Sequence, residues 1–387
     1  MNILLVHPEG NLNYNANLLG LIDLLGEAGH RVTYVAPRRR GLRQDAPARH
    51  TDVVLLEHRE AEGRFMFPAG VWGLSRPRAA DFASWQGYDL VLAVDRGVIE
   101  GASIARHYGI PHALISYEIF FREETSTRYK APEIDACRDV AFAICQDDVR
   151  ARHLSRQNGI PPERVLRIPN AARGFRAALP KPRVLHERFG LAARMKAALH
   201  IGSFAEWTHA PFLLKSTREW PEDWVLVIHE RYGSSAALLK LIRKHADPQR
   251  VRRSEAAFAT PAEMSAFVQS ADLGLALYRP DYANPWIGRN IEDIGLSSGK
   301  IATYLQHGIP VATHELGEIA ELIRTYGAGE VFPLDRPFVP REPPAGSAAA
   351  CRKLFERHLD LDVFGKNLVD AVAAAGSRIA SVARAGA

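Results

Sequence analysis

A strand pattern, a helix pattern and a second strand pattern occupy the first 35 residues, and this order constrains the fold most strongly. Residues 2–7 form a nearly continuous apolar run that ends in a Pro-Glu-Gly turn, as in a strand buried on both faces of a parallel sheet. The apolar residues of the helix pattern that follows share one face: Leu18, Leu21, Ile22 and Leu25. The next strand pattern covers residues 31–35. Two parallel strands joined by a helix need a right-handed crossover, which indicates an open α/β sheet.

The same alternation continues along the chain in two series. The first series predicts strands over residues 53–56, 90–94, 112–116, 140–145 and 165–168, with helices over 98–107 and 147–158. The second series predicts strands over residues 198–201, 224–228, 272–277 and 310–313, with helices over 237–245, 261–270, 299–307 and 319–325. Repeated βα alternation is typical of doubly wound sheets, so we expect two tandem Rossmann-like domains that face each other across a cleft.

Near residue 168 the strand–helix alternation stops and a basic, proline-containing stretch begins. The expected domain boundaries follow from this change. We expect an N-terminal domain over residues 1–168, a basic, proline-containing linker over 169–182 and a C-terminal domain over 183–361. The Ala-rich residues 362–387 predict a last helix that packs back on the N-terminal domain. Residues 279–297 predict a long connection without regular structure, and such loops usually carry function.

The composition excludes several classes of protein. Apolar residues make up 47% and charged residues 24% of the 387 residues, which excludes a disordered chain. The net charge of +5 is too small for a nucleic-acid-binding surface, although it suits an anionic ligand. The three Cys residues lack metal-ligand spacing, which disfavours a zinc site and a disulfide framework. The sequence contains neither an apolar run long enough to span a bilayer nor the basic start of a signal peptide, so we expect a cytoplasmic protein.

The most informative segment is the start of the helix predicted over 299–307. Ser297, Ser298 and Gly299 stand there, and the unpaired N–H groups of a helix start bind phosphate. Lys300 adds a positive charge. The alternative is structural, because Ser is among the most favoured helix N-caps. The sequence has neither the Walker A spacing nor a G-x-G-x-x-G fingerprint, which makes a dehydrogenase the least favoured class.

Three segments resemble motifs of the retaining family-four glycosyltransferases, which have the GT-B fold. Gly29-His30-Arg31-Val32 is similar to the family's G-H-x-V opening, and residues 165–170 are similar to its interdomain linker ending in Ile-Pro-Asn. Residues 297–311 are similar to its donor helix, S-x-K-x-x-E-Y-L-x-x-G-x-P-V. The motifs follow the family's order over nearly the whole chain. The resemblance implies a nucleoside-diphosphate-sugar donor on the C-terminal domain, an acceptor on the N-terminal domain, retention of anomeric configuration and no metal or other cofactor.

The donor side departs from the family pattern in two places. Thr303 stands where a Glu binds the ribose, and Gly295 stands where a second Glu precedes it. A Thr hydroxyl makes one hydrogen bond where a carboxylate makes a bidentate pair. Gly202 and Ser203 stand where the family has cations after the first strand of the C-terminal domain.

The remaining donor-side candidates are cations and strand-end residues. The cations expected to meet the diphosphate are Lys300, Arg289, Arg279 and Arg231. Gly10 would let the loop after the first strand approach the phosphates, although a turn Gly needs no ligand. His229 ends a strand, and its alternative is an imidazole that is satisfied structurally.

The N-terminal domain offers a catalytic carboxylate and three acceptor-side candidates. Tyr117 and Glu118 follow a strand at the place where the family often has a His. Glu118 would accept the proton of the acceptor hydroxyl or stabilise positive charge on the sugar ring. The alternative is a Glu at a helix start, or one paired with Arg122. Asp95 closes another strand, and Arg39 lies in a run of three Arg that would bind an anionic acceptor.

We therefore predict a glycosyltransferase that moves a sugar from a nucleoside-diphosphate sugar, with UDP favoured over GDP, to a hydroxyl group. The acceptor would be a carbohydrate, a lipid-linked molecule or a small molecule, with no nucleic-acid partner. Peripheral contact with the inner face of the membrane stays open. Two other functions stay open: a GT-B nucleotide-sugar epimerase or hydrolase, and a non-catalytic nucleotide-sugar-binding protein, which the two missing Glu residues motivate.

Overall fold

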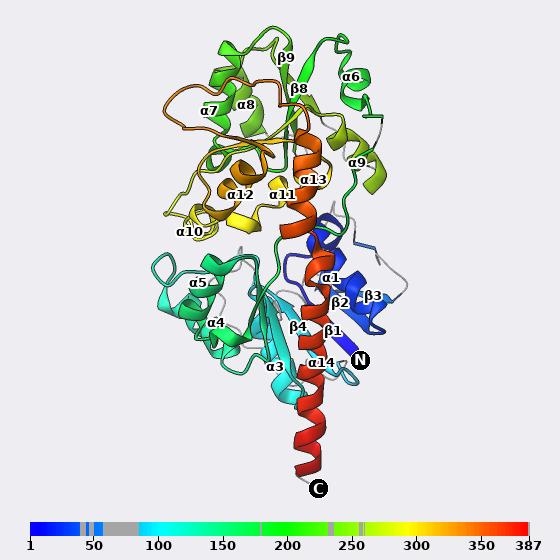
Figure 1. Ribbon diagram of the computed structural model, residues 1–387. Helices are drawn as coiled ribbons and strands as arrows, with labels where there is room; N and C mark the ends of the chain where they lie inside the picture. The colour runs from blue at the N-terminus through cyan, green and yellow to red at the C-terminus, as the bar shows by residue number, and fades with distance from the viewer. Residues whose placement is uncertain are drawn as a thin grey trace. The chain divides into compact units, whose positions relative to one another are not determined.

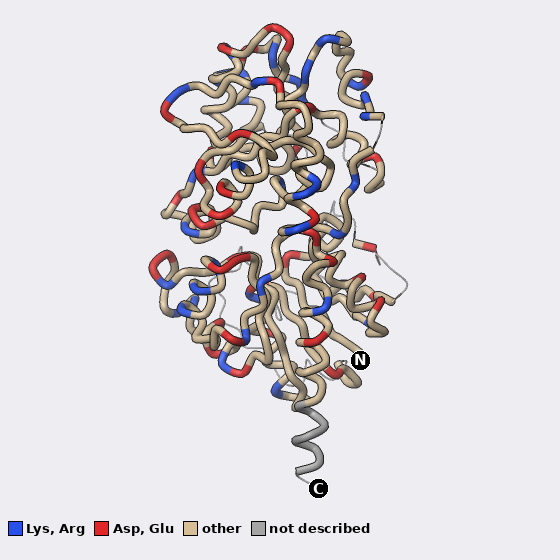
Figure 2. The backbone as a smooth tube through the Cα atoms, viewed as in Figure 1, with Lys and Arg blue, Asp and Glu red and all other residues tan. Residues whose placement is uncertain are grey.

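The protein forms two compact units, each built on its own parallel sheet (Figure 1). A computed structural model describes residues 1–38, 44–45, 50–56, 85–178, 180–230, 236–254, 258 and 260–385. The first unit contains Met1–Arg173 and Leu361–Ala387, and the second unit contains Gly174–Asp360. The prediction of two Rossmann-like domains is confirmed. Lys and Arg are interspersed with Asp and Glu over both units (Figure 2).

The first unit has a seven-stranded sheet in the order β3-β2-β1-β4-β5-β6-β7. Every neighbouring pair is parallel. Its strands are β1 (Asn2–Val6), β2 (Arg31–Pro37), β3 (Thr51–Leu56), β4 (Leu90–Val94), β5 (His112–Ile115), β6 (Ala143–Cys145) and β7 (Val165–Arg167). The strand order reverses between β1 and β4, which is the place where such sheets bind ligands at their carboxyl edge.

Helices cover both faces of this sheet, because successive residues of each strand point to opposite sides. The helices are α1 (Ala16–Glu27), α3 (Gly97–Tyr108), α4 (Thr127–Cys137), α5 (Asp148–Asn158) and α14 (Leu361–Ala385). Ile3 and Leu5 of β1 pack with α1 and α14 in one buried cluster. Leu4 and Val6 pack with α3 and α4 in another. The last helix therefore belongs to the core of the first unit.

The second unit has a six-stranded sheet in the order β10-β9-β8-β11-β12-β13, again parallel throughout. Its strands are β8 (Lys196–Ile201), β9 (Trp224–His229), β10 (Val251–Ser254), β11 (Leu273–Ala276), β12 (Val311–Thr313) and β13 (Gly329–Val331). Its helices are α6 (Val184–Phe189), α7 (Ala210–Ser216), α8 (Ala236–His245), α9 (Pro261–Gln269), α10 (Arg289–Glu292), α11 (Gly299–Gln306), α12 (Glu318–Tyr326) and α13 (Ser347–His358).

One sequence-based expectation about these elements is wrong, and one helix was not predicted. The connection over 279–297 contains α10 and a 3-10 turn at Gly295–Ser297 rather than no regular structure. Helix α4 was not predicted, because it contains Pro132 and lacks a clear apolar stripe. Within the described ranges, no helix combines the length and the apolar composition that a bilayer crossing requires.

Candidate functional site

In the second unit, the carboxyl end of β8 lies beside the start of α11. Gly202 follows β8 with a left-handed φ of +81°. A Cβ at this position would lie 3.1 Å from Lys300 Cε, so the glycine makes room for the lysine side chain. The Lys300 Nζ donates to the carbonyl oxygen of Ser203 at 3.2 Å. Three predicted donor-side residues therefore lie together at one strand end.

Two aromatic rings and an imidazole also surround the Lys300 ammonium. The Nζ atom lies 5.3 Å from the ring centroid of Trp207 and 5.3 Å from that of Tyr278, within the range of cation–π attraction. The Nε2 atom of His200 lies 3.5 Å from the same Nζ. A positive charge held in place at a strand end is suited to stabilising a diphosphate.

The side chain of Ser298 is the N-cap of α11. Its Oγ accepts a hydrogen bond from the Ile301 amide at 3.3 Å and shares another, at 2.6 Å, with the Tyr278 hydroxyl. Ser298 therefore acts as a helix N-cap, which was the structural alternative to phosphate binding. The amides of Gly299 and Lys300 belong to the first turn, where N–H groups have no acceptor within the helix. The backbone of this turn, rather than the serine hydroxyl, is the group suited to an anion.

The two positions that replace the family's glutamates have structural roles. Thr303 donates its hydroxyl hydrogen to the Gly299 carbonyl at 2.7 Å, so only the oxygen lone pairs remain for a ligand. Gly295 begins the 3-10 turn with a φ of +39°. The amide of Ser297 closes that turn by donating to the Ile294 carbonyl at 2.7 Å.

Two of the other predicted donor-side cations, Arg279 and Arg289, lie among the described residues of the second unit. Arg279 is exposed just after β11, and its amide donates to the Trp207 carbonyl at 2.7 Å. This bond joins the loop after β11 to the loop after β8. Arg289 is the first residue of α10. Arg231 lies outside the described residues.

His229 is buried, with 7% of its surface exposed. Its Nδ1 shares a hydrogen bond of 3.0 Å with the Ser254 hydroxyl, and its ring stacks on Phe258 with the centroids 4.3 Å apart. Burial, reinforced by the charge of Arg188, lowers the pKa of His229 to about 4. The imidazole of His229 is therefore neutral at pH 7. Its contacts with Ser254 and Phe258 give it a structural role in the second unit.

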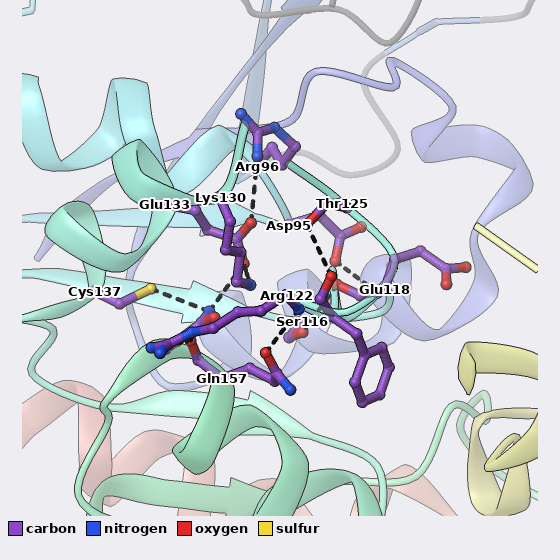
Figure 3. Close-up of polar contacts among 12 residues, drawn as sticks. Asp95, Arg96, Ser116, Glu118, Arg122, Thr125, Lys130, Glu133, Cys137 and Gln157 are labelled. Atoms are coloured by element: carbon purple, nitrogen blue, oxygen red, sulfur yellow. Dashed lines mark hydrogen bonds and ion pairs between the residues drawn. The ribbon is translucent and has the colours of Figure 1, made fainter. Parts of the chain in front are cut away.

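In the first unit, Asp95 holds the turn that carries the predicted catalytic residue (Figure 3). Its Oδ1 accepts hydrogen bonds from the amides of Tyr117, at 2.6 Å, and Glu118, at 2.8 Å. Asp95 has a φ of +47°, an uncommon backbone conformation for a residue other than glycine. Such strain is kept where the surroundings enforce it, often at functional sites.

Glu118 is half-buried beside this aspartate. Burial raises the pKa of Glu118 to about 7, although the positive charge of Arg150 opposes the shift. Burial also raises the pKa of Asp95, and the neighbouring Glu118 raises it further. Arg122 does not form the ion pair expected as the alternative, because its Nε and Nη2 donate to the Gln157 carbonyl at 3.2 and 3.1 Å. A carboxylate with a pKa near 7 can exchange a proton at neutral pH.

Two of the remaining first-unit candidates, Tyr117 and Gly10, take part in hydrogen bonds within that unit. Tyr117 donates its hydroxyl hydrogen to Asn17 Oδ1 at 2.7 Å, which ties the strand end to α1. Gly10 has a φ of +67°, and its carbonyl accepts a hydrogen bond from Gln44 at 2.9 Å. Arg39 lies outside the described residues.

A buried ion network that the sequence did not indicate lies next to Asp95 (Figure 3). Lys130 Nζ lies 2.6 Å from Glu133 Oε1, and Arg96 Nη1 lies 3.3 Å from Glu133 Oε2. All three side chains are at most 6% exposed. Because breaking a buried pair is strongly destabilising, this network fixes α4 against the start of α3. Among the described residues, no group of three or more His, Cys, Asp or Glu is placed to hold a metal ion.

No protein-family model and no curated protein matches the chain by sequence. Solved structures match it in fold. HepE from Anabaena, crystallised with UDP-glucose, superposes with a TM-score of 0.71 over 96% of this chain and 99% of its own, at 15% identity. The chain has the GT-B fold.

Two further structures match the chain in the same GT-B fold over most of their lengths. Sucrose-phosphate synthase from Thermosynechococcus elongatus gives a TM-score of 0.61 at 14% identity, covering 99% of this chain and 98% of its own. WaaG, a glycosyltransferase involved in lipopolysaccharide biosynthesis, gives 0.55 at 13% identity, covering 96% and 94%. The resemblance to GT-B glycosyltransferases that the sequence motifs indicated is therefore confirmed at the level of the fold.

Proposed function

We propose that the protein is a glycosyltransferase that takes a sugar from a UDP-sugar donor, transfers it to a hydroxyl group with retention, and needs no metal. The observation that carries the proposal is the Lys300 ammonium held at the carboxyl end of β8, beside the first turn of α11. The crystallisation of HepE with UDP-glucose supports a UDP-sugar as the donor. The proposed location is the cytoplasm.

The second unit would stabilise the leaving group. When the bond from the anomeric carbon to the diphosphate oxygen breaks, its electron pair and negative charge go to the diphosphate. Lys300 and the first-turn amides of Gly299 and Lys300 would meet that charge, and Arg289 and Arg279 are further candidates. Such fixed donors lower the barrier because they need no reorganisation as the charge develops.

The first unit would handle the acceptor. Glu118, with a pKa of about 7, would take the proton of the acceptor hydroxyl as the new bond to the anomeric carbon forms. Asp95 would hold the Glu118 turn in place through the two amides. The acceptor would be a carbohydrate, a lipid-linked molecule or a small molecule.

The test is calorimetric binding of UDP and GDP, each with and without magnesium, to the wild-type protein and to Lys300→Ala. We expect UDP to bind without magnesium. Lys300→Ala should weaken UDP binding about 10- to 100-fold, since a hydrogen bond to a charged group contributes roughly 1.5–3 kcal/mol. Lys366→Ala, an exposed lysine of the first unit, is the control and should bind UDP as the wild type does. Equal binding by Lys300→Ala, or no UDP binding by the wild type, would contradict the proposal.

A radiolabelled-sugar assay with UDP-glucose separates the two alternatives. Transfer to a member of an acceptor panel supports a glycosyltransferase. UDP release without acceptor, together with a changed sugar, would indicate an epimerase or hydrolase. Binding without turnover would indicate a binding protein. Of the two alternatives, this one has more support, because the Thr303 hydroxyl hydrogen is already donated within its own helix.

A further inference from the structure

His200 is a polar residue in the middle of an apolar sheet. It lies in β8 and has no exposed surface. Its ring packs edge-on against Phe204, with the centroids 4.8 Å apart. Its neighbours along the strand, Leu199 and Ile201, are apolar and buried. A leucine or phenylalanine would suit these surroundings better than an imidazole does.

The contact with Lys300 decides which nitrogen of His200 carries the proton. A lysine ammonium can only donate, so Nε2, at 3.5 Å from Nζ, must be the acceptor. The proton of the neutral ring then lies on Nδ1. This Nδ1 is buried and makes no hydrogen bond to any other residue that the structure describes. A buried N–H without such a partner destabilises the folded protein, so an imidazole is less favourable for stability at this position than an apolar side chain.

The imidazole is neutral in this setting. Burial, and then the charge of Lys300, hold the pKa of His200 well below its usual range. A neutral ring leaves the positive charge of the lysine intact, whereas a carboxylate at the same place would cancel it. The Ser203 carbonyl acts on the same Nζ from the loop after β8. Together the two acceptors restrict the ammonium to the carboxyl end of the strand.

We infer that His200 is a positioning residue, which holds the Lys300 ammonium where it meets the diphosphate of the donor. The inference rests on the proposed function, because it assigns His200 a role through Lys300 in donor binding. His200 acts through the lysine and does not itself touch the donor. Its hydrogen-bond acceptor, rather than its ring volume, is the feature that matters.

The experiment measures UDP binding by calorimetry and melting temperature for His200→Leu, His200→Gln, Lys300→Ala and the double variant. We expect His200→Leu to weaken UDP binding about tenfold while its melting temperature stays equal to the wild type or rises, because the buried N–H is gone. His200→Gln keeps an acceptor oxygen and should bind UDP within about threefold of the wild type. The double variant should bind as Lys300→Ala does, since a residue that acts only through Lys300 adds nothing once the lysine is absent.

His186→Leu is the matched control. His186 is half-buried in the same unit, its Nδ1 also lacks a partner among the described residues, and its Nε2 contacts the Met195 carbonyl at 2.9 Å. Met195 precedes the amino end of β8, about 20 Å along the strand direction from its carboxyl end. His186→Leu should leave UDP binding unchanged. If His200→Leu does not fold, the unbranched His200→Met replaces it.

Wild-type binding of UDP by His200→Leu would overturn the inference, and so would a double variant that loses the sum of both single effects. Either result leaves the proposed function standing, provided that Lys300→Ala binds UDP weakly. If Lys300→Ala binds UDP as the wild type does, the proposed function fails, and the role of His200 fails with it.

Discussion

The ring of Tyr304 lies directly over the backbone of Gly274. A Cβ on that glycine would come within 2.3 Å of the tyrosine Cγ. The Tyr304 hydroxyl donates to the Leu199 carbonyl at 2.8 Å and accepts from the Ile201 amide at 2.9 Å. One side chain of α11 therefore reaches across β11 to β8, and this contact holds the helix that carries Lys300.

Gly274→Ala should lower the free energy of unfolding by about 1–3 kcal/mol, because overpacking a close-packed core forces side chains and backbone to shift. The shift moves α11, so UDP binding should weaken as well. Urea unfolding and calorimetry measure the two effects. In a Tyr304→Ala background the same substitution should add little further loss, because the ring is gone, and an equal loss in both backgrounds would point to a different cause.

Tyr304→Phe keeps the ring and removes the hydroxyl. The buried Ile201 amide then loses its acceptor, so the free energy of unfolding should fall by about 1–3 kcal/mol. Tyr282→Phe, at a tyrosine that is 55% exposed, should change it by less than about 0.5 kcal/mol. Equal stabilities of the two variants in chemical unfolding would show that the hydroxyl does not anchor α11.

The raised pKa of Glu118 predicts a pH dependence of stability. The folded protein binds the Glu118 proton up to about pH 7, whereas an ordinary Glu loses it near 4.5. Between these values the folded state holds more protons than the unfolded state, so this contribution to stability is complete below about pH 4.5 and is lost as the pH rises through 7. Glu118→Gln should flatten the fall in stability between pH 4.5 and 7 in urea unfolding, and an unchanged slope would show that the carboxyl titrates normally.

Asp95→Asn and Asp95→Ala should differ in stability. Asparagine keeps an oxygen that can accept from both amides, and it tolerates a positive φ. Alanine leaves the amides of Tyr117 and Glu118 without this acceptor, so Asp95→Ala should be less stable than Asp95→Asn by about 1–3 kcal/mol. Differential scanning calorimetry of the pair at pH 8 is the measurement. Equal melting temperatures would mean that the carboxylate geometry does not hold the turn.

The strands and helices whose apolar residues follow a regular period could be predicted from the sequence. The apolar run of β1 and the one-faced helix α1 were predictable because a buried strand and a core-facing helix leave periods that the sequence displays directly. The place of Lys300 in the first turn of α11 was also predictable, because a Ser-Ser-Gly-Lys sequence at a helix start is a local pattern. Helix α4 was not predictable, because it contains Pro132 and because its buried side chains include the charged Lys130 and Glu133 as well as apolar residues.

The surroundings of the site depend on contacts between segments far apart in the chain. His200 and Trp207 precede Lys300 by about a hundred residues, and only the sheet order places them beside it. No spacing in the sequence indicates that Ser298 shares a hydrogen bond with Tyr278 or that Asp95 accepts hydrogen bonds from the turn after β5. The only sequence signal for His200 was a histidine within an apolar strand. That signal points to a role in the site only once the contact with Lys300 is known.

The amide of Leu361 donates to the carbonyl of Ala172 at 3.4 Å, and α14 then packs on α1. The chain thus leaves the first unit after Arg173 and returns to it at Leu361, next to the point where it left. The first unit is topologically a host domain, and residues 174–360 are an insert whose two junctions adjoin each other. A direct Arg173–Leu361 splice would join the two segments of the first unit in one continuous polypeptide, and it would cut through neither sheet.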